Sequence, residues 1–377
     1  MINETLAQWS ELFMYLAALI YVVAFIAFTW DVAANSRTTR RLEAEGAAEN
    51  TVPRRTAQLV GAGSRVSSSA EASTEKPAST TKTAGRVTST EQGTGARGMG
   101  FKESAAAKLK DEVADGSMMW GTGTRKRTAA RIAVAVMALG ALVHLAGVLC
   151  RAFAAGRVPW GNMYEFCTTG ALVVSVVYLV SLIFRDLRFV GVLVSGLALI
   201  MMTAATIGFP TPVGHLKPAL QSYWLVIHVS IAVLASGVFT ITFAMAILQL
   251  IQTHRERDII SGRGSRWNFM RLVPSSQALE NFAFRLNAVG FVMWTFTLAA
   301  GAIWAEKAWG RYWGWDTKEV WTFVIWVVYA AYLHARATRG WTGPRSAWLS
   351  IAGYLCIIFN FTIVNVFFSG LHSYSGL

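Results

Sequence analysis

Apolar runs of about 20 residues recur along the whole chain, and they constrain its fold more than any other feature. Each run is long enough to cross a bilayer core of ~30 Å as a helix. Of the 377 residues, 54% are hydrophobic and only 15% are charged, whereas an ordinary soluble domain has about 25% charged residues. These figures exclude a soluble globular enzyme. The three cysteines, Cys150, Cys167 and Cys356, include no CxxC pair, so neither a disulfide scaffold nor a dithiol motif is indicated.

We predict an all-α, polytopic membrane bundle of eight transmembrane helices, because the apolar runs are continuous and lack the alternation of barrel strands. Their approximate ranges are 12–30, 129–152, 164–184, 188–208, 224–251, 285–305, 319–338 and 346–368. Glu4 and Glu11 precede or begin the first run, where a cleavable signal peptide would have basic residues. We therefore interpret residues 1–30 as an N-terminal transmembrane helix.

The distribution of basic residues predicts the orientation of these helices. If the N-terminus lies outside, 28 of the 34 Lys and Arg residues fall on the inner side. The six on the outer side are Arg151, Arg157, Lys217, Lys307, Arg311 and Lys318. We therefore expect a multi-pass protein of the cell membrane with both termini outside. The formal net charge of +13 then reflects topology and contact with anionic lipid, and no nucleic-acid partner is needed to explain it.

Residues 31–128 differ in composition from the rest of the chain. They are rich in Ala, Ser, Thr, Gly and Arg and contain few large apolar residues. Such a stretch cannot bury enough apolar surface to offset the entropy lost on folding. We predict a disordered cytoplasmic linker here, followed by a membrane domain at 129–377.

The window AWGRYWGWDTKEVW, residues 308–321, is the most unusual segment of the chain. It holds four of the 15 tryptophans, together with Asp316, Lys318 and Glu319, in the predicted outer loop between the sixth and seventh spans. Tryptophans are common in interfacial belts, and that interpretation stays open. However, a belt is spread over many helix ends, whereas this cluster occupies one loop. Flat rings edged with charge suit a large planar ligand with ionised substituents, such as a porphyrin.

Two histidines fall at the same predicted membrane depth as this loop. His228 lies about one turn into the fifth span, and His372 follows the last span. Neutral imidazoles that converge from two sides can fill both axial positions of a haem iron. By contrast, His334 follows Glu319 by 15 residues, which is roughly 22 Å of helix. It cannot bind the same iron, so it is either a ligand of a second site or a histidine at the inner interface.

The other three histidines have less specific interpretations. His144 lies within the second span and is either a ligand or a buried, hydrogen-bonded residue. His215, in an outer loop, is structural or an accessory ligand. His254 lies among charged residues on the inner side, and we interpret it as solvated or lipid-facing.

Several segments together resemble the CcsA family, also called ResC or, in actinobacteria, CcsB. WGRYWGWDTKEVW resembles the tryptophan-rich WWD signature of haem-handling proteins in cytochrome c maturation. The flanking segments SYWLVIHV (222–229), VWTFVIWVVYAAYLHAR (320–336) and NVFFSGLHSYSG (365–376) follow the order of that family, as does VPWGNMYEF (158–166). The family commonly has proline after the WWD aspartate, and this sequence has Thr317 instead.

The resemblance implies that the chain is the membrane core of a system II cytochrome c synthetase. In that role, reduced haem b, bound non-covalently, crosses the membrane and is joined to the CxxCH cysteines of an apocytochrome c. His228 and His372 match the external haem ligands, and His334 matches the transmembrane haem ligand. Trp309, Trp313, Trp315, Asp316 and Trp321 match the loop that presents the haem. The implied partners are a ResB-like membrane protein, which supplies the second transmembrane ligand, and a thioredoxin-like thiol reductant.

Three other functions remain open at this point. The first is a haem exporter without ligation activity, which the sequence cannot separate from a synthetase. The second is a b-type electron-transfer subunit. Such a subunit would have pairs of histidines on the same helices at matching depths, whereas the histidines of this chain are scattered and lie at different depths. The third is a structural subunit of a membrane complex. The sequence shows no candidate for a dedicated general base.

Overall fold

The computed structural model describes residues 2–51, 116–120, 127–262, 267–338 and 340–372. Contacts divide the chain into two units, Met1–Arg40 with Lys108–Leu377, and Arg41–Ala107. In the second unit the described residues, 41–51, are helical. The membrane bundle and its candidate site belong to the first unit.

Eight helices in the described part of the chain are long and apolar enough to cross a membrane, which confirms the predicted bundle. They are α1 (Glu4–Thr51), α3 (Thr128–Ala155), α4 (Met163–Phe184), α5 (Gly191–Thr203), α6 (Tyr223–Ile260), α7 (Ser276–Trp309), α8 (Thr317–Thr338) and α9 (Pro344–Phe361). A 3-10 turn and a π turn lengthen α5 to 188–208, and the short α10 (Ile363–Phe367) follows α9. The described residues contain no β-strand.

Several helices run beyond the apolar ranges that the sequence predicts. α1 is helical to Thr51, so residues 31–51 of the predicted linker continue the first helix. These residues are rich in Ala, Glu and Arg, which favour helix without being apolar. Most of the remaining linker, including 52–115, lies outside the described residues.

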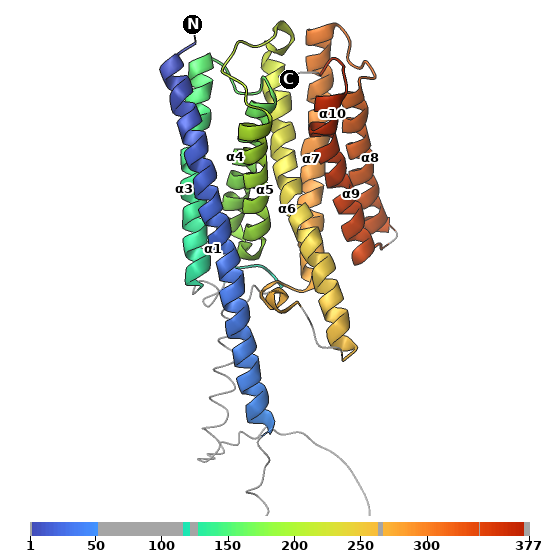
Figure 1. Cartoon of the computed structure of the whole chain (residues 1–377). Coiled ribbons are helices and arrows are strands. Elements are labelled where there is room, and N and C mark those ends of the chain that lie inside the picture. Colours follow the sequence, from blue (N-terminus) through green and yellow to red (C-terminus); the bar gives the residue numbers. More distant parts are fainter. Residues whose placement is uncertain (1, 52–115, 121–126, 263–266, 339, 373–377) are drawn as a thin grey trace, which may run out of the picture. The chain divides into compact units, whose positions relative to one another are not determined.

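The helices pack in two groups that meet at α6. α6 lies against α4, α7 and α9, and α8 packs on α7 and α9. On the other flank α1 and α3 lie side by side (Figure 1), joined where Ser10 Oγ donates to the carbonyl of Gly147 at 2.8 Å. α1 begins and α10 ends at the same end of the bundle, as an even number of spans requires (Figure 1).

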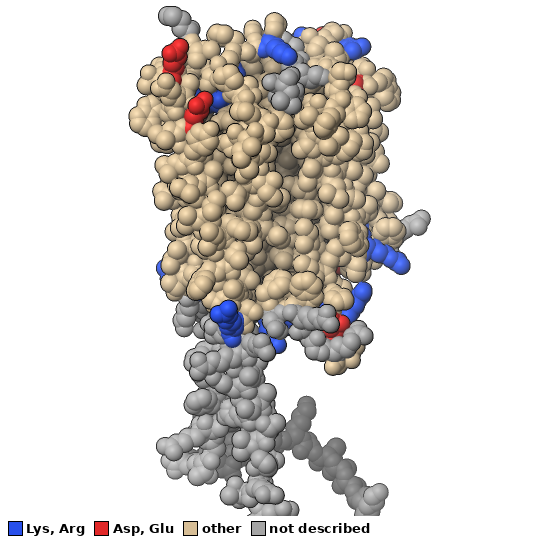
Figure 2. Space-filling view, viewed as in Figure 1, with Lys and Arg blue, Asp and Glu red and all other residues tan. Residues whose placement is uncertain are grey.

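On the face shown in Figure 2, charged side chains gather toward the two ends of the bundle and leave a band between them that is nearly free of Lys, Arg, Asp and Glu. Several buried charged side chains among the described residues form ion pairs, which offsets the cost of burial. One such network lies at the end of the bundle where α1 begins and α10 ends. There Glu165, fully buried, accepts from Arg151 Nε at 2.9 Å and from Arg157 Nη1 at 2.8 Å. The two guanidinium groups also donate to the carbonyls of Thr211 and Gly214, so Glu165 connects the loop after α3 with the loop before α6.

We expect Glu165→Gln to destabilise the protein by about 3 kcal/mol or more, because it leaves two guanidinium groups buried without their countercharge. Thermal unfolding of the detergent-solubilised protein measures the change. The matched control is Glu4→Gln, since Glu4 is exposed at the start of α1 and forms no part of this network. Equal Tm values for Glu165→Gln and wild type would contradict this account of the network.

Candidate functional site

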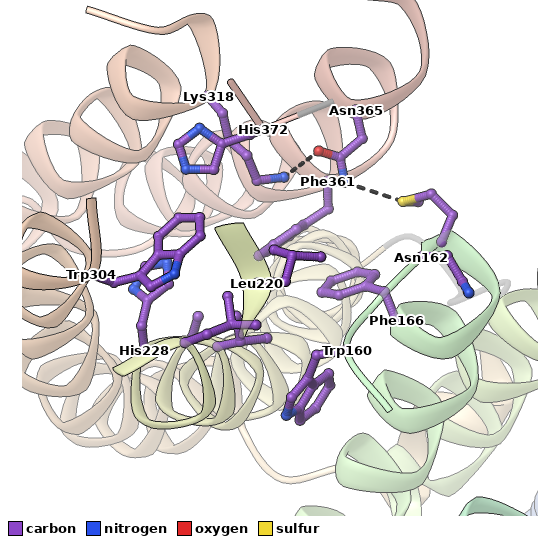
Figure 3. Close-up of a pocket in the computed structure, with 14 residues that line it drawn as sticks. Trp160, Asn162, Phe166, Leu220, His228, Trp304, Lys318, Phe361, Asn365 and His372 are labelled. Carbon is purple, nitrogen blue, oxygen red and sulfur yellow. Dashed lines mark hydrogen bonds between the residues drawn. The ribbon is translucent and has the colours of Figure 1, made fainter. Parts of the chain in front are cut away.

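A cleft of about 640 Å³, part of it open to solvent, lies at the end of the bundle where α1 begins and α10 ends (Figure 1). The starts of α4, α6 and α8, the end of α7 and the segment after α10 contribute to its wall. Figure 3 shows His228, Trp304, Lys318 and His372 around this space. An adjoining cleft of about 430 Å³ is also lined by His228, Lys318 and His372. The structure thus brings together two histidines that are 144 positions apart in the sequence.

His228 is held by a backbone carbonyl of the neighbouring helix. Its Nδ1 lies 2.9 Å from the carbonyl oxygen of Thr297 in α7. A carbonyl can only accept, so Nδ1 carries the hydrogen and Nε2 keeps its lone pair. Gly301, one turn further along α7, makes room for the ring, since a Cβ there would lie 2.7 Å from His228 Cε1. The arrangement leaves Nε2 available as a metal ligand.

His372 is also held through its Nδ1, but by a carboxylate instead of a backbone carbonyl. Its Nδ1 lies 2.7 Å from Asp316 Oδ2. Burial lowers the pKa of His372 and outweighs the hydrogen bond to Asp316, which raises it. Burial raises the pKa of Asp316, but the hydrogen bond and charge of His372 together hold it below its usual value. At neutral pH, therefore, a neutral imidazole donates from Nδ1 to an ionised carboxylate, and Nε2 is again the free nitrogen.

Asp316 also connects the loop at the start of α8 with the segment that carries His372. Its Oδ1 accepts from the backbone N–H of Leu371 at 3.0 Å, next to His372. In turn Glu319 accepts from the backbone N–H groups of Asp316 and Gly314, in the manner of a capping box at the start of α8. Gly370 fits only without a side chain, because its Cβ would lie 2.1 Å from Asp316 Oδ1.

Trp304 of α7 is a central residue of the site that the sequence analysis missed. Its buried ring stacks on His228, with centroids 5.9 Å apart and planes 10° apart. The same ring lies 5.5 Å from the ring of His372 and 4.7 Å from that of Trp309. The only sequence signal for it is a tryptophan five positions before Trp309, inside an apolar run.

Of the four tryptophans in the 308–321 window that are predicted site residues, two lie at the site and two do not. Trp309 lies 4.9 Å from the His372 ring, and Trp313 lines the smaller cleft. Trp315 instead points outward with 78% of its surface exposed, on a backbone with φ 57° that side-chain-bearing residues rarely adopt. Trp321 packs against Phe359 of α9, with ring centroids 4.2 Å apart.

The other histidines lie apart from the cleft. His334 is exposed on α8, and its 15-residue separation from Glu319 sets it roughly 22 Å along the helix. His144 is buried between α1 and α3, where its Nδ1 lies 3.2 Å from Tyr21 Oη. His215 is exposed in a loop, and exposed His254 lies 3.5 Å from Asp258 on the same helix.

Fold and site together define a multi-pass membrane helix bundle with a pair of imidazoles in an aromatic cleft. Residues 160–372 match the family model described as Cytochrome C assembly protein, and the chain belongs to this family. It is 36% identical over 239 residues to the cytochrome c biogenesis protein CcsA of Guillardia theta, covering 59% of this chain and 78% of that protein. The corresponding protein of Microcystis aeruginosa is 32% identical over 285 residues, covering 64% and 85%.

The protein of the same name from Chlamydomonas reinhardtii is 31% identical over 245 residues, covering 63% of this chain and 67% of its own length. These relatives confirm the resemblance inferred from the WWD window and its flanking segments. The chain therefore acts in cytochrome c biogenesis, a process that handles haem and works with partner proteins.

We expect Gly370→Ala to lower cytochrome c maturation roughly ten- to hundred-fold, because the added Cβ displaces Asp316 or the segment that carries His372. Haem staining of c-type cytochromes measures this, in a strain where this chain and its maturation partners are the only system. Gly208→Ala is the matched control, since a Cβ there meets nothing within 4 Å. Unchanged maturation by Gly370→Ala at equal membrane abundance would show that this contact is dispensable.

Proposed function

We propose that the cleft binds haem b non-covalently, with Nε2 of His228 and of His372 as the two axial ligands. One observation carries the proposal: both imidazoles line the same cleft, and each has its Nδ1 held by an acceptor. Haem-binding histidines are oriented through the nitrogen that does not bind the metal.

Trp304 forms the wall of the haem site between the two histidines. Two nitrogens that bind one iron lie roughly 4 Å apart, which is twice a metal–imidazole bond. Trp304 contacts both imidazole rings, so its indole moves aside or packs against the porphyrin as the haem enters. Trp309 and Trp313 cover the ring from the loop side, and exposed Trp315 is available to the incoming apocytochrome.

The bound haem is then joined to the apocytochrome at the extracytoplasmic face. Each cysteine thiol of CxxCH adds across one vinyl group: the S–H bond breaks, an S–C bond forms, and the hydrogen goes to the other vinyl carbon. Catalysis is mainly the positioning of two thiols against two vinyl groups. The histidine of CxxCH replaces one axial imidazole and releases the product. A thioredoxin-like reductant keeps the two cysteines in the thiol form.

His334 serves a second haem site within the membrane. Its side chain is exposed on α8, so a second ligand has to come from outside the described chain. A ResB-like membrane protein that packs against α8 supplies it. The excess of Lys and Arg at the other ends of the helices supports an extracytoplasmic position for the His228–His372 cleft.

We expect His228→Ala and His372→Ala each to lower cytochrome c maturation by at least roughly ten-fold, because each removes one axial ligand. Added imidazole should restore part of the yield by replacing the lost ligand. His215→Ala is the matched control, since His215 is an exposed histidine in a nearby loop. Normal maturation by either variant without added imidazole would refute the ligand assignment.

A haem exporter without ligation activity is the second candidate function. Co-expression of this chain with a ResB-like partner and an apocytochrome c, in a strain that lacks maturation genes, separates the two. We expect covalent haem on the apocytochrome. If haem reaches the outer face but remains unattached, the exporter is the correct function.

A further inference from the structure

Lys318 places a positive charge in the wall of the cleft, and neither axial ligation nor the fold accounts for it. It lines both clefts together with His228 and His372. Its Nζ donates to Asn365 Oδ1, as the dashed line in Figure 3 shows, and lies 5.0 Å from the centre of the Phe361 ring. Both contacts are with neutral groups. A partly buried ammonium normally has a carboxylate partner.

The carboxylates of the loop are already engaged elsewhere. The two oxygens of Asp316 accept from Leu371 N–H and His372 Nδ1. Glu319 Oε2 accepts from the backbone N–H groups of Gly314 and Asp316. Among the described residues, no ion pair within 4.0 Å includes Lys318. Its ammonium therefore retains the capacity to bind an anion.

Asn365 adds a second donor at the same edge of the cleft. While its Oδ1 accepts from Lys318, its Nδ2 lies 3.1 Å from Met163 Sδ. A thioether is a weak acceptor, and an amide nitrogen has two hydrogens to donate. Lys318 and Asn365 thus present an ammonium and an amide side by side. A carboxylate, whose two oxygens share one negative charge, fits this pair of donors.

We propose that Lys318 Nζ and Asn365 Nδ2 bind a carboxylate of the haem, namely one of its two propionates. This inference rests on the proposed haem site. The porphyrin then has its iron at the imidazoles and its propionate edge toward α10. Because the vinyl groups lie on the other two pyrroles, this contact fixes the rotation of the ring about its axis and directs the vinyl edge away from α10. Lys318 is thus a positioning residue that decides which edge meets the thiols.

The test compares ferrous protoporphyrin IX iron with its dimethyl ester, which lacks the propionate charges. Both are titrated into the purified full chain with its membrane partner, in a His334→Ala background, so that the absorption of the bis-imidazole complex reports binding at the His228–His372 cleft alone. We expect wild type to bind the free acid about ten-fold more tightly than the ester, the usual effect of one charge-assisted hydrogen bond. Lys318→Met should reduce this ratio to near one by weakening binding of the free acid alone.

Two further variants make the result specific. Lys318→Arg retains the charge and should keep most of the preference for the free acid. Lys307→Met should behave as wild type, because Lys307 is exposed at the end of α7 and paired with Glu306. Equal affinity of wild type for acid and ester, or an unchanged ratio in Lys318→Met, would overturn the propionate assignment.

The same titration distinguishes this failure from a failure of the proposed function. A bis-imidazole spectrum with both porphyrins, but with no preference for the acid, rejects only the role of Lys318. Absence of that spectrum with either porphyrin rejects the His228–His372 site, and the propionate assignment with it.

Discussion

The hydrogen bond between the Asp316 carboxylate and Nδ1 of His372 is the contact on which the rest of the site depends. The described residues after α10, 368–372, form no helix, so their position depends on the contacts they make with the rest of the site. Asp316 accepts from both Leu371 N–H and His372 Nδ1. One carboxylate thereby joins the tryptophan-rich loop, the start of α8 and the last described residues. The same carboxylate also fixes the His372 tautomer. It therefore sets both where the His372 ring lies and which of its nitrogens is free to bind a metal.

His228 is also held through its Nδ1, but by a backbone carbonyl instead of a carboxylate. Its Nδ1 is held by a carbonyl of α7, and Gly301 allows that helix to approach. The contact depends on the close packing of α6 and α7, which is a property of the bundle. One proposed axial ligand is thus fixed by the membrane helices and the other by a loop outside them. We propose that this difference allows the loop-held histidine to release the haem while the helix-held histidine retains it.

The sequence predicted the number and approximate positions of the helices because continuous apolar runs have few alternatives in a membrane. It also indicated that His228, His372 and the tryptophan loop belong at one depth, because each lies at the end of a run. It could not predict Trp304, Thr297 or Gly301, since their roles arise from the side-by-side packing of α6 and α7. The helix of α1 beyond residue 30 was missed because hydropathy reports the membrane crossing and says nothing of helix length. Trp321 fits the WWD pattern, but its ring packs against Phe359 because it lies on another face of α8.

The axial coordination of the haem in the purified complex tests the central claim most directly. Electron paramagnetic resonance of the ferric form distinguishes two axial imidazoles from other ligand sets, and nitrogen-15 labelling of histidine identifies the bound nitrogens. Because we propose that His334 serves a separate haem, the measurement is made in a His334→Ala background. We predict a six-coordinate, low-spin iron with two histidine nitrogens that are lost one at a time in His228→Ala and His372→Ala. A signal that neither variant changes would contradict the account.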